Sequence, residues 1–210
     1  MPLYKEIFTS AKSVVGIWRM TESLEQLEAI ELSHQDLEIY KTFKIEKRKR
    51  EWLAVRHALK AISGNVMQIV YNSKRKPTIE NSDYSISISH SNNFVAVYIN
   101  AESEVGIDIE EVRNKILNIK EKFCSEKELE FVSKNNTAAH VTICWSAKES
   151  LYKFYAEKKL DFKKHILLNS FELNTHGILF AEVKIENYHK QLKVNYLVDP
   201  EFVMTYVADL

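Results

Sequence analysis

The chain has 210 residues, 45% of them hydrophobic and 28% charged, which suffices for one sizeable domain or two small ones around a buried core. Its 29 basic and 29 acidic side chains give a formal net charge of zero, so no global field points to nucleic acid or a membrane surface as a partner. No apolar run approaches the ~18 residues that a membrane span requires.

The N-terminal stretch Met1–Glu6 lacks the apolar core of a signal peptide. Cys124 and Cys144 have no CxxC motif and no histidine at metal-ligand spacing, so we expect two reduced, partly buried thiols. Together with the lack of a membrane span, these features predict a soluble cytoplasmic protein.

Strands and helices are both expected along the first half of the chain. A helix over 44–62 is strongly predicted, because apolar residues recur on one stripe from Trp52 to Ile62. Strict alternation over 84–90, a turn and an apolar run over 94–99 predict a hairpin. The other expected elements are a strand over 13–20, a helix from Leu24 to about Ile30, a helical segment capped at Ser33, a strand over 69–71 and a basic turn over 72–77.

The second half is expected to contain one long helix and several strands. The helix over 137–155 is apolar on two sides, which indicates packing between layers. Ser125 and Glu128 have the spacing of a capping box and open a helix toward Val132. The other expected elements are a strand over 105–110, a helical stretch over 115–123 and strands around 168–173, 178–185, 192–198 and 202–208.

Two short segments recur about half a chain length apart. The sequence over 202–207 is similar to that over 94–99, and Trp145-Ser146-Ala147 is similar to Trp52-Leu53-Ala54. We interpret this as a faint internal duplication. It predicts an α+β fold with two similar halves, 1–104 and 105–210, related by a pseudo-two-fold. The active site would lie in the cleft between them, and a monomer would be the default state.

The stretch 105–110 alternates apolar residues with Gly106, Asp108 and Glu110. Asp108 and Glu110 therefore share one strand face, about 7 Å apart at roughly 3.3 Å per residue. Two carboxylates so placed repel each other and favour a cation, and a hard ion such as Mg²⁺ takes oxygen ligands of this kind. The alternative is a solvated edge strand with two surface acids.

Glu149 and Lys153 stand one turn apart on the long helix, with Lys148 beside them. Such a pair is often only a surface ion pair. This helix is otherwise heavily apolar, however, so we expect the pair to line a cleft. Glu149 would then add a third carboxylate to Asp108 and Glu110 and leave coordination positions for water and phosphate.

Several basic residues are candidate phosphate ligands. Arg50 and Arg56 can make planar bidentate contacts, and Lys76 is a point charge on a turn. His90 ends a strand and can project into a cleft, although a capping or surface role is the alternative. The basic run 44–50 is either a solvated helix face or a surface for an acidic partner.

Five short blocks stand in a distinctive order. GIDIE at 106–110 precedes WSAKESLYK at 145–153 by about 35 residues, and upstream lie REWLAVRHAL at 50–59, Lys76-Pro77 and SISISHS at 85–91. In this order the blocks resemble the 4′-phosphopantetheinyl transferases, specifically the Sfp-type monomers with two similar halves. The likeness covers most of residues 48–155. The upstream blocks are similar to the basic N-terminal helix, the Gly-Lys-Pro block and the Asn-Ile-Ser-His-Ser block of that family.

The resemblance implies transfer of the phosphopantetheine arm of coenzyme A to a serine of an apo acyl or peptidyl carrier protein, with release of adenosine 3′,5′-bisphosphate. It makes Asp108, Glu110 and Glu149 the ligands of Mg²⁺. Glu149 would also act as the base for the serine hydroxyl, directly or through water, and Lys153 would stabilise or protonate the leaving phosphate. The positions it implies for coenzyme contact are Arg50, Arg56, Lys76, Ser89, His90 and Lys153, with Arg50 and His90 near the 3′-phosphate.

Two residues depart from the family pattern. Arg75 stands where a glycine usually precedes Lys-Pro, and Asn92 stands where a glycine often follows Ser-His-Ser. Neither change removes a charged group, but both affect the loops expected to hold the coenzyme.

A carrier protein would present its serine at the start of an acidic helix, so basic residues near the cleft would steer it. The candidates are Lys115, Lys120, Lys122 and the remaining basic residues of 44–49. The alternatives are another Mg²⁺-dependent phosphoryl-transfer enzyme, such as a nuclease or phosphohydrolase, or an inert coenzyme- or carrier-binding module. Neutral overall charge disfavours a nuclease, and retention of three acids and Lys153 disfavours an inert module.

Overall fold

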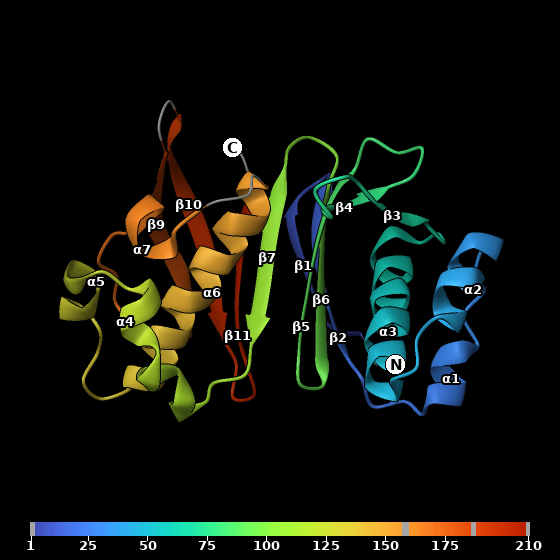
Figure 1. Ribbon diagram of the computed structural model, residues 1–210, viewed down its shortest axis with the longest axis horizontal. Coiled ribbons are helices and arrows are strands. Elements are labelled where there is room, and N and C mark those ends of the chain that lie inside the picture. Colours follow the sequence, from blue (N-terminus) through green and yellow to red (C-terminus); the bar gives the residue numbers. More distant parts are fainter. Residues whose placement is uncertain (1–2, 157–159, 186–187, 209–210) are drawn as a thin grey trace. The chain divides into compact units, whose positions relative to one another are not determined.

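A computed structural model describes residues 3–156, 160–185 and 188–208 of the chain. The chain divides into two compact units, Met1–Glu102 and Ser103–Leu210 (Figure 1). Each unit combines helices with antiparallel strands, which confirms the α+β class predicted from the sequence. The two-fold relation and the shared cleft remain predictions. No helix in the described residues is long and apolar enough to cross a lipid bilayer, and Met1 and Pro2 of the N-terminal stretch lie outside those residues.

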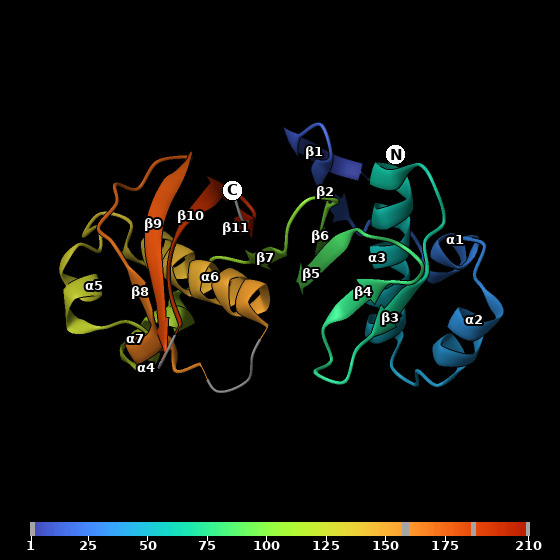
Figure 2. The same ribbon diagram turned by 90° about the horizontal axis from the view of Figure 1, so that it is seen from above.

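The first unit contains one antiparallel sheet covered by a long helix. The sheet has the strand order β1-β2-β6-β5, and β3 pairs separately with β4. Figure 1 and Figure 2 show α1 and α2 on the side of α3 that faces away from the sheet. The elements are β1 (Leu3–Ser10), β2 (Ser13–Arg19), α1 (Leu24–Glu28), α2 (His34–Lys41), α3 (Glu46–Ser63), β3 (Ile69–Tyr71), β4 (Pro77–Ile79), β5 (Ser85–Ser91) and β6 (Phe94–Asn100).

The predicted apolar stripe of α3 packs against this sheet. Val55 and Leu59 join a core with Val95 and Val97 of β6, and burial of side chains of this size stabilises a fold by about 1.5–3 kcal/mol each. Trp52 packs instead with α1 residues in a second cluster that includes Leu27. The helix therefore has two apolar faces, one toward the sheet and one toward α1.

The second unit contains a longer sheet with one central helix. Among the described residues the strand order is β7-β11-β10-β9-β8, and every neighbouring pair is antiparallel. Helix α6 packs against β7 and β11 of this sheet and also contacts η1; its packing between two layers remains a prediction. The elements are β7 (Val105–Glu110), a 3₁₀ helix η1 (Asn114–Asn118), α4 (Lys120–Phe123), α5 (Glu126–Glu130), α6 (Thr137–Tyr155), α7 (Phe162–His165), β8 (Ile166–Leu168), β9 (His176–Ile185), β10 (Tyr188–Val198) and β11 (Val203–Ala208).

Some expected elements differ from the structure. The sequence did not indicate β1, because most of its side chains are exposed at a sheet edge and carry no clear alternation. The three-residue strand β4 begins at Pro77, the last residue of the expected turn, and no element was expected at Thr78 and Ile79. The strand expected over 168–173 is wrong, since β8 ends at Leu168. Phe171 contacts His140 and Tyr196 from outside the sheet, so its apolar character reflects core packing of a loop.

A close approach between β7 and α6 defines the middle of the second unit. A Cβ atom added to Gly106 would lie 1.9 Å from the Ser150 carbonyl oxygen and 2.9 Å from the Phe154 backbone nitrogen. Both neighbours are backbone atoms of a packed helix, so they cannot turn aside as a side chain could. Only glycine fits at this position without moving the helix off the strand.

Replacing Gly106 with alanine should therefore destabilise the protein by about 2 kcal/mol or more, in the range of severe overpacking. Urea unfolding followed by circular dichroism measures this change. Gly16→Ala is the matched control, because its added Cβ would meet only the Ile62 side chain, at 2.5 Å. The close approach would be disproved if the two variants unfolded at the same urea concentration.

A fully buried ion pair joins three other elements of the second unit. The Lys148 ammonium lies 2.8 Å from a Glu128 carboxylate oxygen, and neither side chain is more than 2% exposed. Lys148 also donates to the carbonyl oxygens of Phe162, at 2.8 Å, and Ile166, at 2.6 Å. Glu128 accepts from the backbone nitrogens of Ser125, at 2.6 Å, and Leu168, at 2.8 Å. Lys148 therefore belongs to the core and not to a cleft.

Lys148→Met should cost about 3–5 kcal/mol of unfolding free energy, because it leaves the Glu128 carboxylate buried without its cation. The double variant Lys148→Met with Glu128→Leu should recover part of this loss, since no buried charge then remains. Denaturant titrations of the two variants and the parent test this. Equal stability of the single and double variants would contradict it.

Candidate active site

The acidic residues of β7 face α6. Gly106, Asp108 and Glu110 alternate along the strand, so they share one face, and Gly106 sets that face against the backbone of the helix. The predicted shared face of the two acids is therefore confirmed. Asp108 is only 4% exposed, which excludes a solvated surface acid at this position. Glu110, at the end of the strand, is half-buried.

Lys153 of α6 contacts Asp108. Its Nζ donates to Asp108 Oδ1 at 2.8 Å and to the Ile107 carbonyl oxygen at 2.9 Å. These two acceptors lie on adjacent residues of β7, so the ammonium connects the last turns of the helix to the strand. This contact partly neutralises a carboxylate that burial would otherwise disfavour.

Trp145 of α6 holds the other acid of the strand. Its indole Nε1 donates to Glu110 Oε1 at 2.9 Å. The ring itself is packed between Phe123 and Phe162, with ring centroids 5.0 and 5.5 Å away. A fixed indole donor thus orients the Glu110 carboxylate. Sequence reasoning did not predict this contact of Trp145, because a hydrogen bond across 35 positions leaves no local signal.

Glu149 lies beside both acids. The pKa of Glu149 is raised from 4.5 to about 7, mainly by burial and then by the charge of Asp108, with a smaller increase from Glu110, while Lys153 opposes the rise. The side chain is half-buried. The charges of Asp108, Glu110 and Lys153 therefore all act on the Glu149 carboxyl group. Strand β7 and helix α6 therefore bring together the four residues on which the predicted chemistry depends.

The donor chemistry of this acidic group suits Mg²⁺. Three carboxylates supply only hard oxygen donors, and the mutual repulsion felt at Glu149 is what a divalent cation would relieve. Within the described residues no three His, Cys, Asp or Glu side chains form a metal-holding cluster as they stand. Lys153 contacts Asp108 and Trp145 contacts Glu110. That Asp108, Glu110 and Glu149 hold the ion remains a prediction.

Buried hydroxyl groups fix the register of α6 on the sheet. Ser146 Oγ lies 2.9 Å from Thr205 Oγ1 and donates to the Asp108 carbonyl oxygen at 3.3 Å. Thr205 Oγ1 donates to Ser150 Oγ at 3.2 Å. These contacts connect the helix to β7 and β11 on either side of the acids. Sequence reasoning missed them, because serine on an apolar helix gives no indication of its partner.

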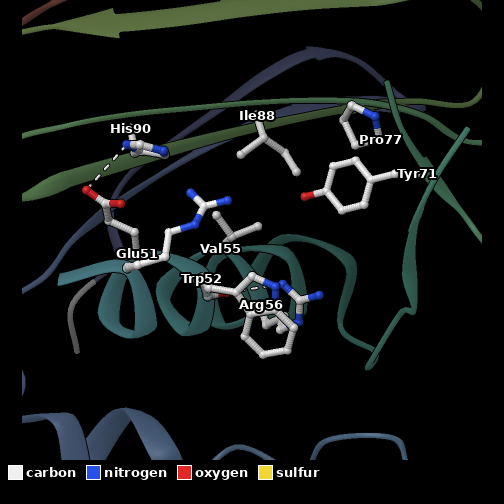
Figure 3. Close-up of a pocket in the computed structure, with 9 residues that line it drawn as sticks. Glu51, Trp52, Val55, Arg56, Tyr71, Pro77, Ile88 and His90 are labelled. Carbon is white, nitrogen blue, oxygen red and sulfur yellow. Dashed lines mark hydrogen bonds and ion pairs between the residues drawn. The ribbon is translucent and has the colours of Figure 1, made fainter. Parts of the chain in front are cut away.

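All the residues expected to hold a coenzyme except Lys153 lie in the first unit. A pocket of about 180 Å³ is lined by residues of α3, β3, β4 and β5, as Figure 3 shows. Of the predicted residues, Arg56 and His90 line it. Ser89 is buried next to His90 on β5, and Arg50 and Lys76 are half-buried. The lining residues are Arg48, Glu51, Trp52, Val55, Arg56, Tyr71, Pro77, Ile88 and His90.

Arg56 is engaged within the unit. Its guanidinium donates to the two Asp36 carboxylate oxygens at 2.8 and 3.1 Å and to the Trp52 carbonyl oxygen at 3.2 Å. Burial lowers the pKa of Arg56, and Asp36 opposes that change. The fork-shaped pair joins α2 to α3. Arg56 therefore has a structural role here, and its contact with a coenzyme remains a prediction.

The two departures from the family pattern occupy left-handed backbone positions. Arg75 has φ of 66° in the turn between β3 and β4, and Asn92 has φ of 52° in the turn between β5 and β6. Glycine adopts this conformation without strain, and asparagine tolerates it better than arginine does. The Asn72 side chain supports the first turn, since its Oδ1 accepts from the backbone nitrogens of Lys74 and Lys76 at 2.9 and 3.0 Å. The turns thus keep a glycine-like backbone without glycine.

The second unit matches a known family. Residues 104–207 match the family model of the 4′-phosphopantetheinyl transferase superfamily. The matched segment contains all four of Asp108, Glu110, Glu149 and Lys153. No curated protein matches the chain.

The raised pKa of Glu149 predicts how stability depends on pH. In the folded protein this carboxyl group binds its proton up to about pH 7, whereas its ordinary value is 4.5. Its stabilising contribution is therefore complete below the ordinary value and is lost as the pH rises through 7. Glu149→Gln has no carboxyl group to titrate at this position. When a chelator removes metal ions, the unfolding free energy of Glu149→Gln should therefore rise relative to that of the parent as the pH increases from about 5 to about 8.

Chemical denaturation at several pH values measures the effect, with the exposed Glu130→Gln as control. Mg²⁺ should stabilise the parent more at the upper end of the range, because the ion favours the ionised carboxylate. A pH-independent difference between Glu149→Gln and the parent would contradict the assignment.

Proposed function

We propose that the protein is an Sfp-type 4′-phosphopantetheinyl transferase. It transfers the phosphopantetheine arm of coenzyme A to a serine of an apo acyl or peptidyl carrier protein and releases adenosine 3′,5′-bisphosphate. The observation that carries this proposal is the family match over the unit in which three carboxylates and a lysine gather on β7 and α6. We further propose that the enzyme works as a cytoplasmic monomer.

The acids would have distinct tasks. Asp108, Glu110 and Glu149 would hold Mg²⁺, which when bound neutralises charge on the pyrophosphate of the coenzyme. Burial raises the pKa of Glu149 to about 7, which suits a group that accepts the proton of the serine hydroxyl near neutral pH, directly or through water. Trp145 would keep Glu110 oriented by its hydrogen bond of 2.9 Å.

Two residues of the chain would account for the proton transfers of the reaction. The serine oxygen forms a bond to the β-phosphorus of the coenzyme, and the bridging bond to the departing phosphate breaks. Glu149 takes the serine proton. Lys153 has three N–H donors, two of which contact β7; the third would stabilise or protonate the departing oxygen. Positioning and charge neutralisation, not covalent catalysis, supply the rate.

Arg50, Lys76, Ser89 and His90 would contact the coenzyme, with Arg50 and His90 near its 3′-phosphate. The basic residues Lys115, Lys120 and Lys122 would steer an acidic carrier protein toward the enzyme. Lys120 and Lys122 lie on the short helix α4, and Lys115 lies on η1 just before it.

One assay distinguishes this proposal from its alternatives. When the protein is incubated with coenzyme A, Mg²⁺ and an apo carrier protein, the carrier should gain roughly 340 Da, the mass of the transferred group, in a Mg²⁺-dependent reaction. Mass spectrometry of the intact carrier measures the gain. Coenzyme binding without any gain over a broad carrier panel would favour an inert binding module, and cleavage of nucleic acid would favour a nuclease.

Asp108→Ala should lower the transfer rate by about 100-fold or more, because removal of one charge-stabilising group from such a site often costs 10²–10³ in rate. Coenzyme affinity should change far less. Transfer kinetics and calorimetric binding separate the two effects, with Glu111→Ala, next to the strand, as the control variant. Full activity of Asp108→Ala would eliminate the metal-site assignment.

A further inference from the structure

A buried carboxylate lies beside the pocket of the first unit. Glu51, on α3, is only 7% exposed and lines the pocket together with His90 of β5. Burial of a carboxylate is costly unless a cation or hydrogen-bond donors compensate it. The groups near Glu51 therefore indicate what it does there.

Two groups that can carry a positive charge lie near the Glu51 carboxylate. His90 Nδ1 is 3.5 Å from Glu51 Oε1, and Lys47 Nζ is 3.8 Å away. The Lys47 side chain is 72% exposed, so water screens its attraction strongly, whereas that of His90 is 39% exposed. The imidazole is therefore the stronger partner of the carboxylate.

The pair bridges the helix and the strand. Figure 3 shows Glu51 reaching from α3 toward His90 on β5, with the ion pair drawn between them. Since Nδ1 faces the carboxylate, Nε2 lies on the opposite edge of the ring. An imidazole fixed by one nitrogen presents the other in a defined direction, as a carboxylate does for a metal-bound histidine.

The charges around the pocket explain why a carboxylate is needed. Arg48 and Arg56 of α3 also line it, and their positive charges disfavour a protonated imidazole. Tyr71 of β3 adds a hydroxyl group that is neutral at physiological pH. Asp36 of α2 already pairs with Arg56, and Glu51 is the acid among these lining groups that faces His90.

We propose that Glu51 is a positioning residue that acts through His90: its carboxylate orients the imidazole and keeps it protonated, so that Nε2–H is presented to an anionic group of the ligand. The inference rests on the proposed function, because that function supplies a phosphate-bearing ligand for the first unit. It adds an acidic residue to a site that the sequence described only in terms of basic residues.

The pairing is tested without any ligand. The ring signals of His90 are followed by NMR over a pH titration in the parent, in Glu51→Gln and in Glu46→Gln, an exposed acid on the same helix. Removal of the Glu51 charge should lower the titration midpoint of His90 by roughly half a unit to one unit, and Glu46→Gln should leave it unchanged. An unchanged midpoint in Glu51→Gln overturns the proposal.

Ligand binding is tested with adenosine 3′,5′-bisphosphate as the probe. Calorimetry should show about three- to tenfold weaker binding of the probe to Glu51→Gln than to the parent near neutral pH. Affinity falls as the pH rises, and in Glu51→Gln this fall should begin at a lower pH than in the parent. In a His90→Gln background, Glu51→Gln should have no further effect, because the carboxylate acts through the imidazole. An equal loss in both backgrounds overturns the proposal.

Thermal unfolding followed by circular dichroism shows whether Glu51→Gln is folded. The variant Glu51→Asp keeps the negative charge, so the midpoint of its His90 titration should lie close to that of the parent. If the parent protein does not bind the probe, the proposed function fails. The NMR titration then still decides whether Glu51 controls His90.

Discussion

The close approach of β7 to α6 is the constraint on which the second unit depends. Because Gly106 has no side chain, the strand lies directly against the Ser150 carbonyl oxygen. That contact places Asp108 and Glu110, two and four residues further along the same face, opposite the turns of α6 that carry Trp145, Glu149 and Lys153. Buried hydroxyl contacts of Ser146 and Ser150 with Thr205 then fix the helix along its axis. A bulkier residue at 106 would separate the acids from the helix. The absence of a side chain at Gly106 therefore determines both the packing of β7 on α6 and the position of the acids.

The two lysines of the helical motif have opposite roles, although they are only five positions apart. Lys148 points into the core, where Glu128 and two carbonyl oxygens satisfy its charge. Lys153 contacts Asp108 from a side chain that is 27% exposed. The first stabilises the loops around α5 and α7, and the second remains close to solvent. Lys153 therefore neutralises part of the charge near the acids, while the core carries its own separate pair.

The first unit shows how a binding surface is built from structural contacts. Arg56 looks like a phosphate ligand in the sequence, but its guanidinium is held by Asp36 and thereby joins α2 to α3. Arg75 and Asn92 occupy left-handed positions that glycine would fill without strain, so the turns retain their shape while the side chains differ. Next to Arg56, the buried Glu51 pairs with His90. In this pocket, acids determine what the basic residues are able to contact.

The sequence by itself determined the α+β class, nearly all helices, the hairpin of β5 and β6, and the shared face of Asp108 and Glu110. These features follow from local periodicity, capping residues and turn residues, which act over a few positions of the chain. It could not supply the exposed edge strand β1 or the roles of Trp145, Lys148, Arg56 and Glu51. Each of those side chains is defined by a partner between 20 and 39 positions away. Only tertiary packing decides which groups meet across such separations, because burial and charge act through space and leave no periodic pattern in the sequence.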